Sequence, residues 1–451
     1  MELETGLIRM PEERARPLRV GIFAAVPESG RMGGTEQHVM GLVRALGRLP
    51  DGDEEYVILT DRSNPHWLDS YLGRNQIAKA FPITRVAPSL RRVLLSFARA
   101  NLSAALKRRV RTLLNRGPAG IFVHGPHDSD GSLESLALDV VHFPYQHFIR
   151  TSIPSIFNPH DLLHLHYPCF FPLEQVAARE AYYPIACRAA SQVVVPSSWV
   201  ARDVVEKYGL EPQRVQVIPH APVTEAYVLV NQEQLDLVRR QWTLPRSFAF
   251  YPAQTWPHKN HLRLLRALAH LRDERALSVN LVCTGWQNEF WPKISQEIRR
   301  LGLERQVHFL GFVPPGTLRA IYRLASFVVL PTLFEGGCFP MLEAFREEVP
   351  VACAAATHLP EQAGDAALLF DPTSELSIAG AVERMALDQA LRETLRQRGT
   401  QRVQLFTWDR VARTHRALYR RLSGRALTAD EETLLRLPLP SDQEAGRECV
   451  A

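Results

Sequence analysis

FVVLPTLFEGGCFPMLEAF, residues 327–345, joins an apolar run to a glycine turn and two acids. An apolar run such as Phe327 to Leu330 is typical of a buried parallel strand, and the residues from Pro340 onward favour the first turns of a helix. The stretch therefore predicts a strand, a loop and a helix N-terminus. Ligands bind at this place in open α/β sheets, outside the carboxyl ends of the strands.

The loop carries groups that suit a ligand with phosphates and hydroxyls. Gly336 and Gly337 allow close approach of the backbone, and the free N–H groups and dipole of a helix N-terminus favour anions. The carboxylates of Glu335 and Glu343 can each accept hydrogen bonds from a pair of hydroxyls. A nucleotide-sugar fits this description. The alternative is that both acids are solvated on one helical face.

Short apolar runs alternate with helical patterns along the chain, which indicates βαβ units and parallel sheets. The pattern breaks after Pro222 and restarts near Ser247, with a hinge expected between them. Strands are expected at 19–26, 56–60, 140–143, 155–158, 192–195 and 215–218, and again at 247–251, 279–283, 307–310, 327–330, 349–353 and 367–370.

We therefore predict an α/β protein with two doubly wound, Rossmann-like domains that face a cleft. The first domain spans residues 1–222 and the second spans residues 223–424, followed by a tail at 425–451. The periodic stretch from Thr407 predicts a last helix, which we expect to pack back on the first domain. A length of 451 residues agrees with two cores, since one core rarely grows so large.

The composition, 46% hydrophobic and 22% charged, is that of a soluble globular protein. There is no apolar run of about 20 residues and no charged start followed by an apolar stretch. The six cysteines are scattered without a Cys-x-x-Cys pair, which favours reduced thiols over disulfides or a zinc site. We expect a cytoplasmic protein.

Charge is distributed unevenly along the chain. From Ser70 to His127 there is no Asp or Glu, although lysines and arginines are frequent. Such asymmetry points to an anionic partner. Within it, the basic segment, residues 85–116, has apolar residues near helical spacing with cations between them. It predicts a basic amphipathic helix that lies on an anionic membrane or grips a lipid-diphosphate acceptor; ordinary packing on the sheet is the alternative. It lacks an aromatic platform, so we expect no nucleic acid.

Three further loops follow expected strands. Gly33 and Gly34 open a helix after the first strand and are placed to admit a phosphate, or form a plain tight turn. His160 follows the strand at 155–158 beside Asp161; a metal site with His164 and His166 would need a particular turn. Lys259 follows the first strand of the second domain and suits a phosphate, or is a solvated surface lysine.

The chain resembles the retaining glycosyltransferases of the GT-B fold, in particular family 4, the group 1 glycosyltransferases. Their signature is Glu-x7-Glu, found at Glu335 and Glu343. The order of the supporting matches is also that of the family. These are Gly33-Gly34-Thr35-Glu36, His160-Asp161-Leu162, Val195-Pro196-Ser197-Ser198-Trp199, Val217-Ile218-Pro219, His258-Lys259-Asn260, Leu310-Gly311-Phe312-Val313 and Gly364-Asp365-Ala366-Ala367.

The resemblance implies a role for each matching residue. Glu335 contacts the donor sugar, Glu343 holds the ribose, and Lys259 faces the pyrophosphate. His160 lies close to the donor sugar, and Gly33 and Gly34 lie under the diphosphate. The backbone N–H groups around Gly337, Cys338 and Phe339 face the sugar.

Two departures from the family pattern stand out. Gln254 occupies the place of an Arg that often precedes the Lys by about five residues, so one cation on the leaving pyrophosphate is missing or is supplied from elsewhere, although a Gln can still donate through its amide. Such a loss costs a few kcal/mol of transition-state stabilisation unless another group supplies it. Gly337-Cys338 stands where the commoner pattern has an aromatic residue and a Gly, which bears on the sugar preference.

The resemblance implies a metal-independent transfer of a hexosyl group, mannosyl or rhamnosyl, with retention. The donor is a nucleotide diphosphate sugar, no other cofactor is expected, and the acceptor is a glycan or lipid-linked hydroxyl, as in polysaccharide biosynthesis. Peripheral contact with the inner membrane face is expected through the basic segment. The alternative is a non-catalytic nucleotide- or glycan-binding module that keeps the fold.

Overall fold

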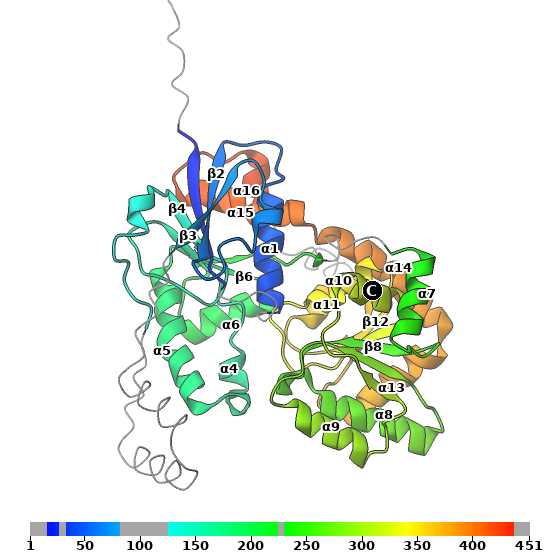
Figure 1. Ribbon diagram of the computed structural model, residues 1–451. Coiled ribbons are helices and arrows are strands. Elements are labelled where there is room, and N and C mark those ends of the chain that lie inside the picture. The colour runs from blue at the N-terminus through cyan, green and yellow to red at the C-terminus, as the bar shows by residue number, and fades with distance from the viewer. Residues whose placement is uncertain (1–15, 27–32, 82–124, 224–229, 437–451) are drawn as a thin grey trace, which may run out of the picture.

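The computed structural model describes residues 16–26, 33–81, 125–223 and 230–436 (Figure 1). The basic segment lies outside these residues. No helix within them is both long and apolar enough to cross a membrane.

The described residues form two parallel sheets in sequence order. The first has the strand order β3-β2-β1-β4-β5-β6-β7. Its strands are β1 (Leu18–Ala24), β2 (Glu54–Asp61), β3 (Gln76–Phe81), β4 (Val140–Phe143), β5 (Ser155–Phe157), β6 (Gln192–Val195) and β7 (Val215–Val217).

The second sheet has the order β10-β9-β8-β11-β12-β13. Its strands are β8 (Ala249–Pro252), β9 (Leu281–Thr284), β10 (Val307–Phe309), β11 (Phe327–Leu330), β12 (Val351–Ala354) and β13 (Ala367–Phe370). In both sheets the order reverses once, between β1 and β4 and between β8 and β11, as doubly wound folds require. The predicted fold class is confirmed.

Helices cover the sheets and connect the strands (Figure 1). Those of the first half are α1 (Gly34–Leu46), α4 (Leu163–His166), α5 (Leu173–Ala189) and α6 (Ser198–Tyr208). Those of the second half are α7 (Gln232–Gln241), α8 (His261–Arg275), α9 (Trp291–Arg300), α10 (Pro315–Leu324), α11 (Phe339–Arg346), α12 (Leu359–Ala363), α13 (Glu375–Leu387) and α14 (Gln389–Arg402), followed by α15 (Trp408–Leu422) and α16 (Ala429–Arg436).

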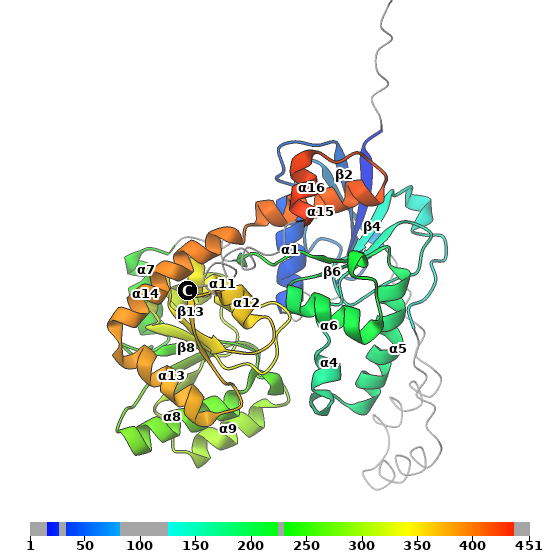
Figure 2. The same cartoon turned by 180° about the vertical axis from the view of Figure 1, so that it is seen from behind.

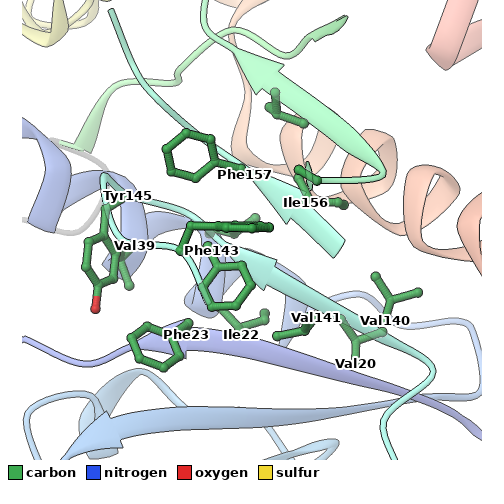
Figure 3. Close-up of a cluster of buried hydrophobic side chains, with 14 of the residues drawn as sticks. Val20, Ile22, Phe23, Val39, Val140, Val141, Phe143, Tyr145, Ile156 and Phe157 are labelled. Carbon is green, nitrogen blue, oxygen red and sulfur yellow. The ribbon is translucent and has the colours of Figure 1, made fainter. Parts of the chain in front are cut away.

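Each sheet has its own hydrophobic core, built from the strand runs that the sequence shows. In the first core, Phe143 of β4 lies between Phe23 of β1 and Phe157 of β5 (Figure 3). The Phe23 and Phe143 ring centroids are 5.4 Å apart. Strands buried on both faces are continuous apolar runs, which is why these elements were predictable.

The chain returns to the first domain at its end. Helix α15 begins after Thr407, whose hydroxyl accepts the Arg410 N–H as an N-cap, and packs along α1. Tyr419 of α15 is buried in the first core, and its hydroxyl is 2.8 Å from Nδ1 of His142. Both views show α15 and α16 beside the first sheet (Figure 2).

The structure adds three elements to those expected from the sequence. Strand β3 was not predicted, because four of its six residues are exposed and its sequence lacks an apolar run. The segment between 222 and 246, where a hinge is expected, contains α7, which packs on α10. The tail contains α16, where Glu431 accepts a hydrogen bond of 2.7 Å from Arg420.

Candidate functional site

Three of the predicted site residues, Gly33, Lys259 and Glu335, follow strands at the points where the two sheets reverse their order. Lys259 lies in the short helical turn after β8, and Glu335 lies in the loop after β11, its neighbour in the second sheet. Gly33 follows β1 of the first sheet and immediately precedes α1. Crevices open at such switch points, because the adjoining connections run to opposite faces of the sheet.

Lys259 and Glu335 form an ion pair, with Nζ donating to Oε1. Their side chains are only 19% and 14% exposed. Burial lowers the pKa of Lys259, but the Glu335 carboxylate outweighs it and holds the pKa above its usual value. The lysine therefore carries a full positive charge at neutral pH.

Hydrogen bonds fix the two loops that hold this pair. The Tyr251 hydroxyl donates to the carbonyl of Lys259 at 2.6 Å, and the N–H of Leu333 donates to that of His258 at 2.8 Å. Asn260, at a left-handed φ of 61°, donates from Nδ2 to the Pro331 carbonyl at 2.9 Å. The Lys259 loop is thus tied to the end of β11.

Glycines allow the two domains to touch at the site. A Cβ on Gly336 would lie 2.7 Å from the carbonyl oxygen of His160, and one on Gly34 would lie 3.3 Å from the Phe339 ring. A Cβ on Gly337 would lie 2.6 Å from Nδ1 of His220. These glycines thus allow the backbone of each domain to approach atoms of the opposite domain closely.

His160 faces this junction in an uncommon conformation, with φ at 65°. Its Nε2 lies 3.0 Å from the carbonyl oxygen of Pro144. A carbonyl only accepts, so Nε2 carries the proton and Nδ1 keeps its lone pair. Burial lowers the pKa of His160 to about 4, which leaves the ring neutral at pH 7. His160 is thus an acceptor toward a hydroxyl and does not carry charge.

The alternative metal site does not form from the three histidines near β5. His164 pairs with Glu180 and His166 with Asp203, each at 2.9 Å, while His160 bonds to the backbone. In the described ranges, no group of three or more His, Cys, Asp or Glu side chains is arranged to hold a metal ion.

The expectation for Cys338 needs correction. Its N–H donates to Oε1 of Gln362 at 3.1 Å, and its carbonyl accepts from Nε2 of the same amide at 2.8 Å. The side chain is 2% exposed and belongs to the second core. Cys338 therefore contacts its own domain through both its backbone and its thiol, and its N–H is not directed at a ligand.

Glu343 lies in α11, the helix that follows the Glu335 loop, and is buried. Its Oε2 accepts a hydrogen bond of 2.6 Å from the Tyr322 hydroxyl. Burial raises the pKa of Glu343 to about 7, and the nearby Glu347 adds to this, although the Tyr322 hydrogen bond opposes it. The Glu343 carboxyl group thus changes its charge near neutral pH.

Several residues at the junction could not be identified from the sequence. His220 stacks on Phe339 with ring centroids 4.6 Å apart. Glu361 accepts hydrogen bonds from the N–H groups of Ser198 and Trp199, at 2.8 and 3.0 Å, across the domain boundary. A negative charge is favoured at a helix N-terminus, but Glu361 is 163 residues from Ser198 in the chain, so no local sequence pattern reveals this contact.

The chain matches two family descriptions over adjoining ranges. Residues 32–225 match Glycosyltransferase Family 4, and residues 238–402 match Glycosyl transferases group 1. It is 26% identical over 250 residues to O-antigen chain mannosyltransferase B of Escherichia coli, covering 55% of this chain and 66% of that protein. It is 29% identical over 232 residues to D-inositol 3-phosphate glycosyltransferase of Corynebacterium aurimucosum, covering 49% and 55%. The chain therefore spans only part of the length of these curated relatives.

Solved structures share the fold at low identity. Sucrose-phosphate synthase from Thermosynechococcus elongatus aligns with a TM-score of 0.64 at 18% identity, over 90% of this chain and 99% of that one. Anabaena Alr3699/HepE in complex with UDP and glucose aligns at 0.63 and 17%, over 90% and 100%. With two family matches in sequence order on two doubly wound sheets, the chain belongs to the group 1 glycosyltransferases of the GT-B fold, family 4.

Proposed function

We propose that this protein transfers a hexosyl group, with mannosyl as the first candidate, from a nucleotide diphosphate sugar to a hydroxyl of a glycan or lipid-linked acceptor. The observation that carries the proposal is the partly buried Lys259–Glu335 pair at the β8/β11 switch point. Two relatives from Escherichia coli named as mannosyltransferases support the sugar, at 26% and 28% identity.

The ion pair suits a donor that brings its own negative charge. A diphosphate beside Lys259 competes with Glu335 for the ammonium group, and its negative charge stabilises the charged lysine in place of the carboxylate. Glu335 is then free to accept hydrogen bonds from sugar hydroxyls, and Nδ1 of His160 offers a second acceptor. Lys259 and the N-terminus of α1 at Gly34 oppose the charge that builds on the leaving phosphate.

The proposed chemistry needs little from the protein besides this charge. The bond from the anomeric carbon to the phosphate oxygen breaks, and a bond to the acceptor oxygen forms on the same face. Bond formation on the face that the phosphate leaves gives retention, and the acceptor proton passes to the departing phosphate oxygen. We propose that this step needs no metal ion, because Lys259 and helix N-termini supply the positive charge.

The test is release of nucleoside diphosphate from a panel of UDP, GDP, ADP and dTDP sugars, with water or added glycans as acceptor. Lys259→Met and Glu335→Gln should each lower turnover by about a hundredfold, as loss of one charge-stabilising group does. Lys207→Met, at an exposed lysine of α6, is the matched control and should turn over like wild type.

Each other result has a distinct meaning. Unchanged turnover in Lys259→Met and Glu335→Gln would show that the reacting centre lies elsewhere. Donor binding without transfer to any acceptor would favour the non-catalytic binding module. A wild-type protein that binds no sugar nucleotide would refute the proposed function altogether.

A further inference from the structure

Gln254 lies at the boundary between the domains, in the loop that connects β8 to the Lys259 turn. A Cβ on Gly33 would lie 3.1 Å from the amide nitrogen Nε2 of Gln254. Gly33 itself has φ at 59° and ψ at −131°, a conformation that favours glycine, and it directly precedes α1. The amide of Gln254 and the N-terminus of α1 thus face the same space.

The direction of the Gln254 amide follows from its other neighbour. The indole Nε1 of Trp256 lies 2.7 Å from Oε1 of Gln254. An indole N–H only donates, so the amide must present its oxygen to Trp256. The reversed amide would set two N–H groups against each other. The NH2 group therefore points away from Trp256, toward Gly33.

The backbone around Trp256 is held on both sides. The N–H of the preceding Thr255 donates to the carbonyl of Trp286 at 3.2 Å, and the carbonyl of Trp256 accepts from the N–H of Lys259 at 3.0 Å. Thr255 is fully buried, whereas the Trp256 side chain is 39% exposed. Trp256 belongs to neither hydrophobic core, so the hydrogen bond from its indole to Gln254 is its distinctive contact among the described residues.

We propose that Trp256 is a positioning residue that keeps the amide N–H groups of Gln254 directed at the diphosphate of the donor. The inference rests on the proposed function, because it assigns a role toward the same donor. In this chain an oriented neutral amide then takes the position of a second cation. Without Trp256, the amide turns freely and offers its oxygen to the phosphate as readily as its nitrogen, which repels the anion.

The experiment compares the affinities of a nucleoside diphosphate and of the matching monophosphate by calorimetry, with GDP and GMP or UDP and UMP. Trp256→Phe keeps an aromatic ring but removes the donor. It should weaken diphosphate binding by about fivefold to tenfold and leave the monophosphate unchanged, as expected for one hydrogen bond to a charged group. Gln254→Ala should lose a similar factor.

Two further variants separate positioning from a structural effect. Adding Trp256→Phe to Gln254→Ala should cause no further loss, because the amide that Trp256 orients is gone. Trp286→Phe is the matched control: this neighbouring indole is 54% exposed and forms no side-chain hydrogen bond with the described residues. It should keep the ratio of diphosphate to monophosphate affinity. Gln254→Arg should make diphosphate binding insensitive to Trp256→Phe, since a guanidinium presents only donors.

The outcomes distinguish this inference from the proposed function. If Trp256→Phe weakens both nucleotides equally, or weakens the Gln254→Ala protein further, then Trp256 acts on the fold or the base and the inference is wrong. If wild type binds diphosphate and Trp256→Phe binds it as tightly, the inference alone fails. If wild type binds neither nucleotide, the proposed function fails first and the role of Trp256 with it.

Discussion

Glu343 gives the sharpest pH-dependent prediction. If its carboxylate holds the two hydroxyls of the ribose, it must be ionised, because a protonated acid has fewer acceptor sites. Burial raises its pKa to about 7, so the charged form that binds is the minor one in mildly acidic solution. We therefore expect donor affinity to increase as the pH rises through 7.

The magnitude follows from the titration. With a pKa of about 7, the carboxylate is about 9% ionised at pH 6 and about 91% ionised at pH 8. If only the ionised form binds, affinity should rise about tenfold between these two values. The same pKa shift makes folding stability change in the opposite direction to donor affinity as the pH rises. The folded pKa lies above the usual 4.5, so the contribution of Glu343 to stability is present below 4.5 and is lost as the pH rises to about 7.

The assay is calorimetric titration with an intact nucleotide-sugar. Its phosphates are both esterified, so the ligand keeps its charge over this range, unlike a monoester that titrates near 6. Glu343→Gln should bind weakly with a flat pH profile. Tyr322→Phe should move the midpoint to higher pH, because the Tyr322 hydrogen bond lowers the pKa of Glu343. Equal affinity of wild type at pH 6 and pH 8, or a full pH slope in Glu343→Gln, would refute the reasoning.

Three further predictions concern stability and surface binding. Gly337→Ala places a Cβ 2.6 Å from His220 and 3.2 Å from Pro196, so the free energy of unfolding should fall by about 1–3 kcal/mol in thermal unfolding. The loss should be smaller in a His220→Ala background. An unchanged unfolding midpoint would show that the domain interface accommodates the methyl group without strain. Burial lowers the pKa of His415 to about 4, so the contribution of this residue to folding stability is present above pH 6.5 and is lost as the pH falls toward 4, by about 2 kcal/mol at pH 5. The free energy of unfolding should therefore decrease less between pH 7 and pH 5 in His415→Asn than in wild type. An identical decrease in the two proteins would contradict this prediction. The basic segment at 85–116 should carry the protein to anionic vesicles at low salt in flotation, and absence of binding there removes the membrane role.

The sequence alone determined most of the strands and the composition of the site. A parallel strand covered by helices on both faces is apolar throughout, so β11 and β4 are visible as runs of Val and Phe. Glycines and charged residues directly after such runs identify the carboxyl edge of a sheet. This local logic predicted the loops of Gly33, His160, Lys259 and Glu335 without any knowledge of how they meet.

Only the tertiary structure decided which of these residues touch and in what state. Cys338 bonds to Gln362, Phe339 stacks on His220, and Gln254 is oriented by Trp256 next to Gly33. Most of these contacts join residues far apart in the chain, and burial at the junction sets the protonation of His160 and Glu343. Local patterns carry no information about burial between domains or about side-chain direction, and these two quantities control hydrogen-bond polarity and charge.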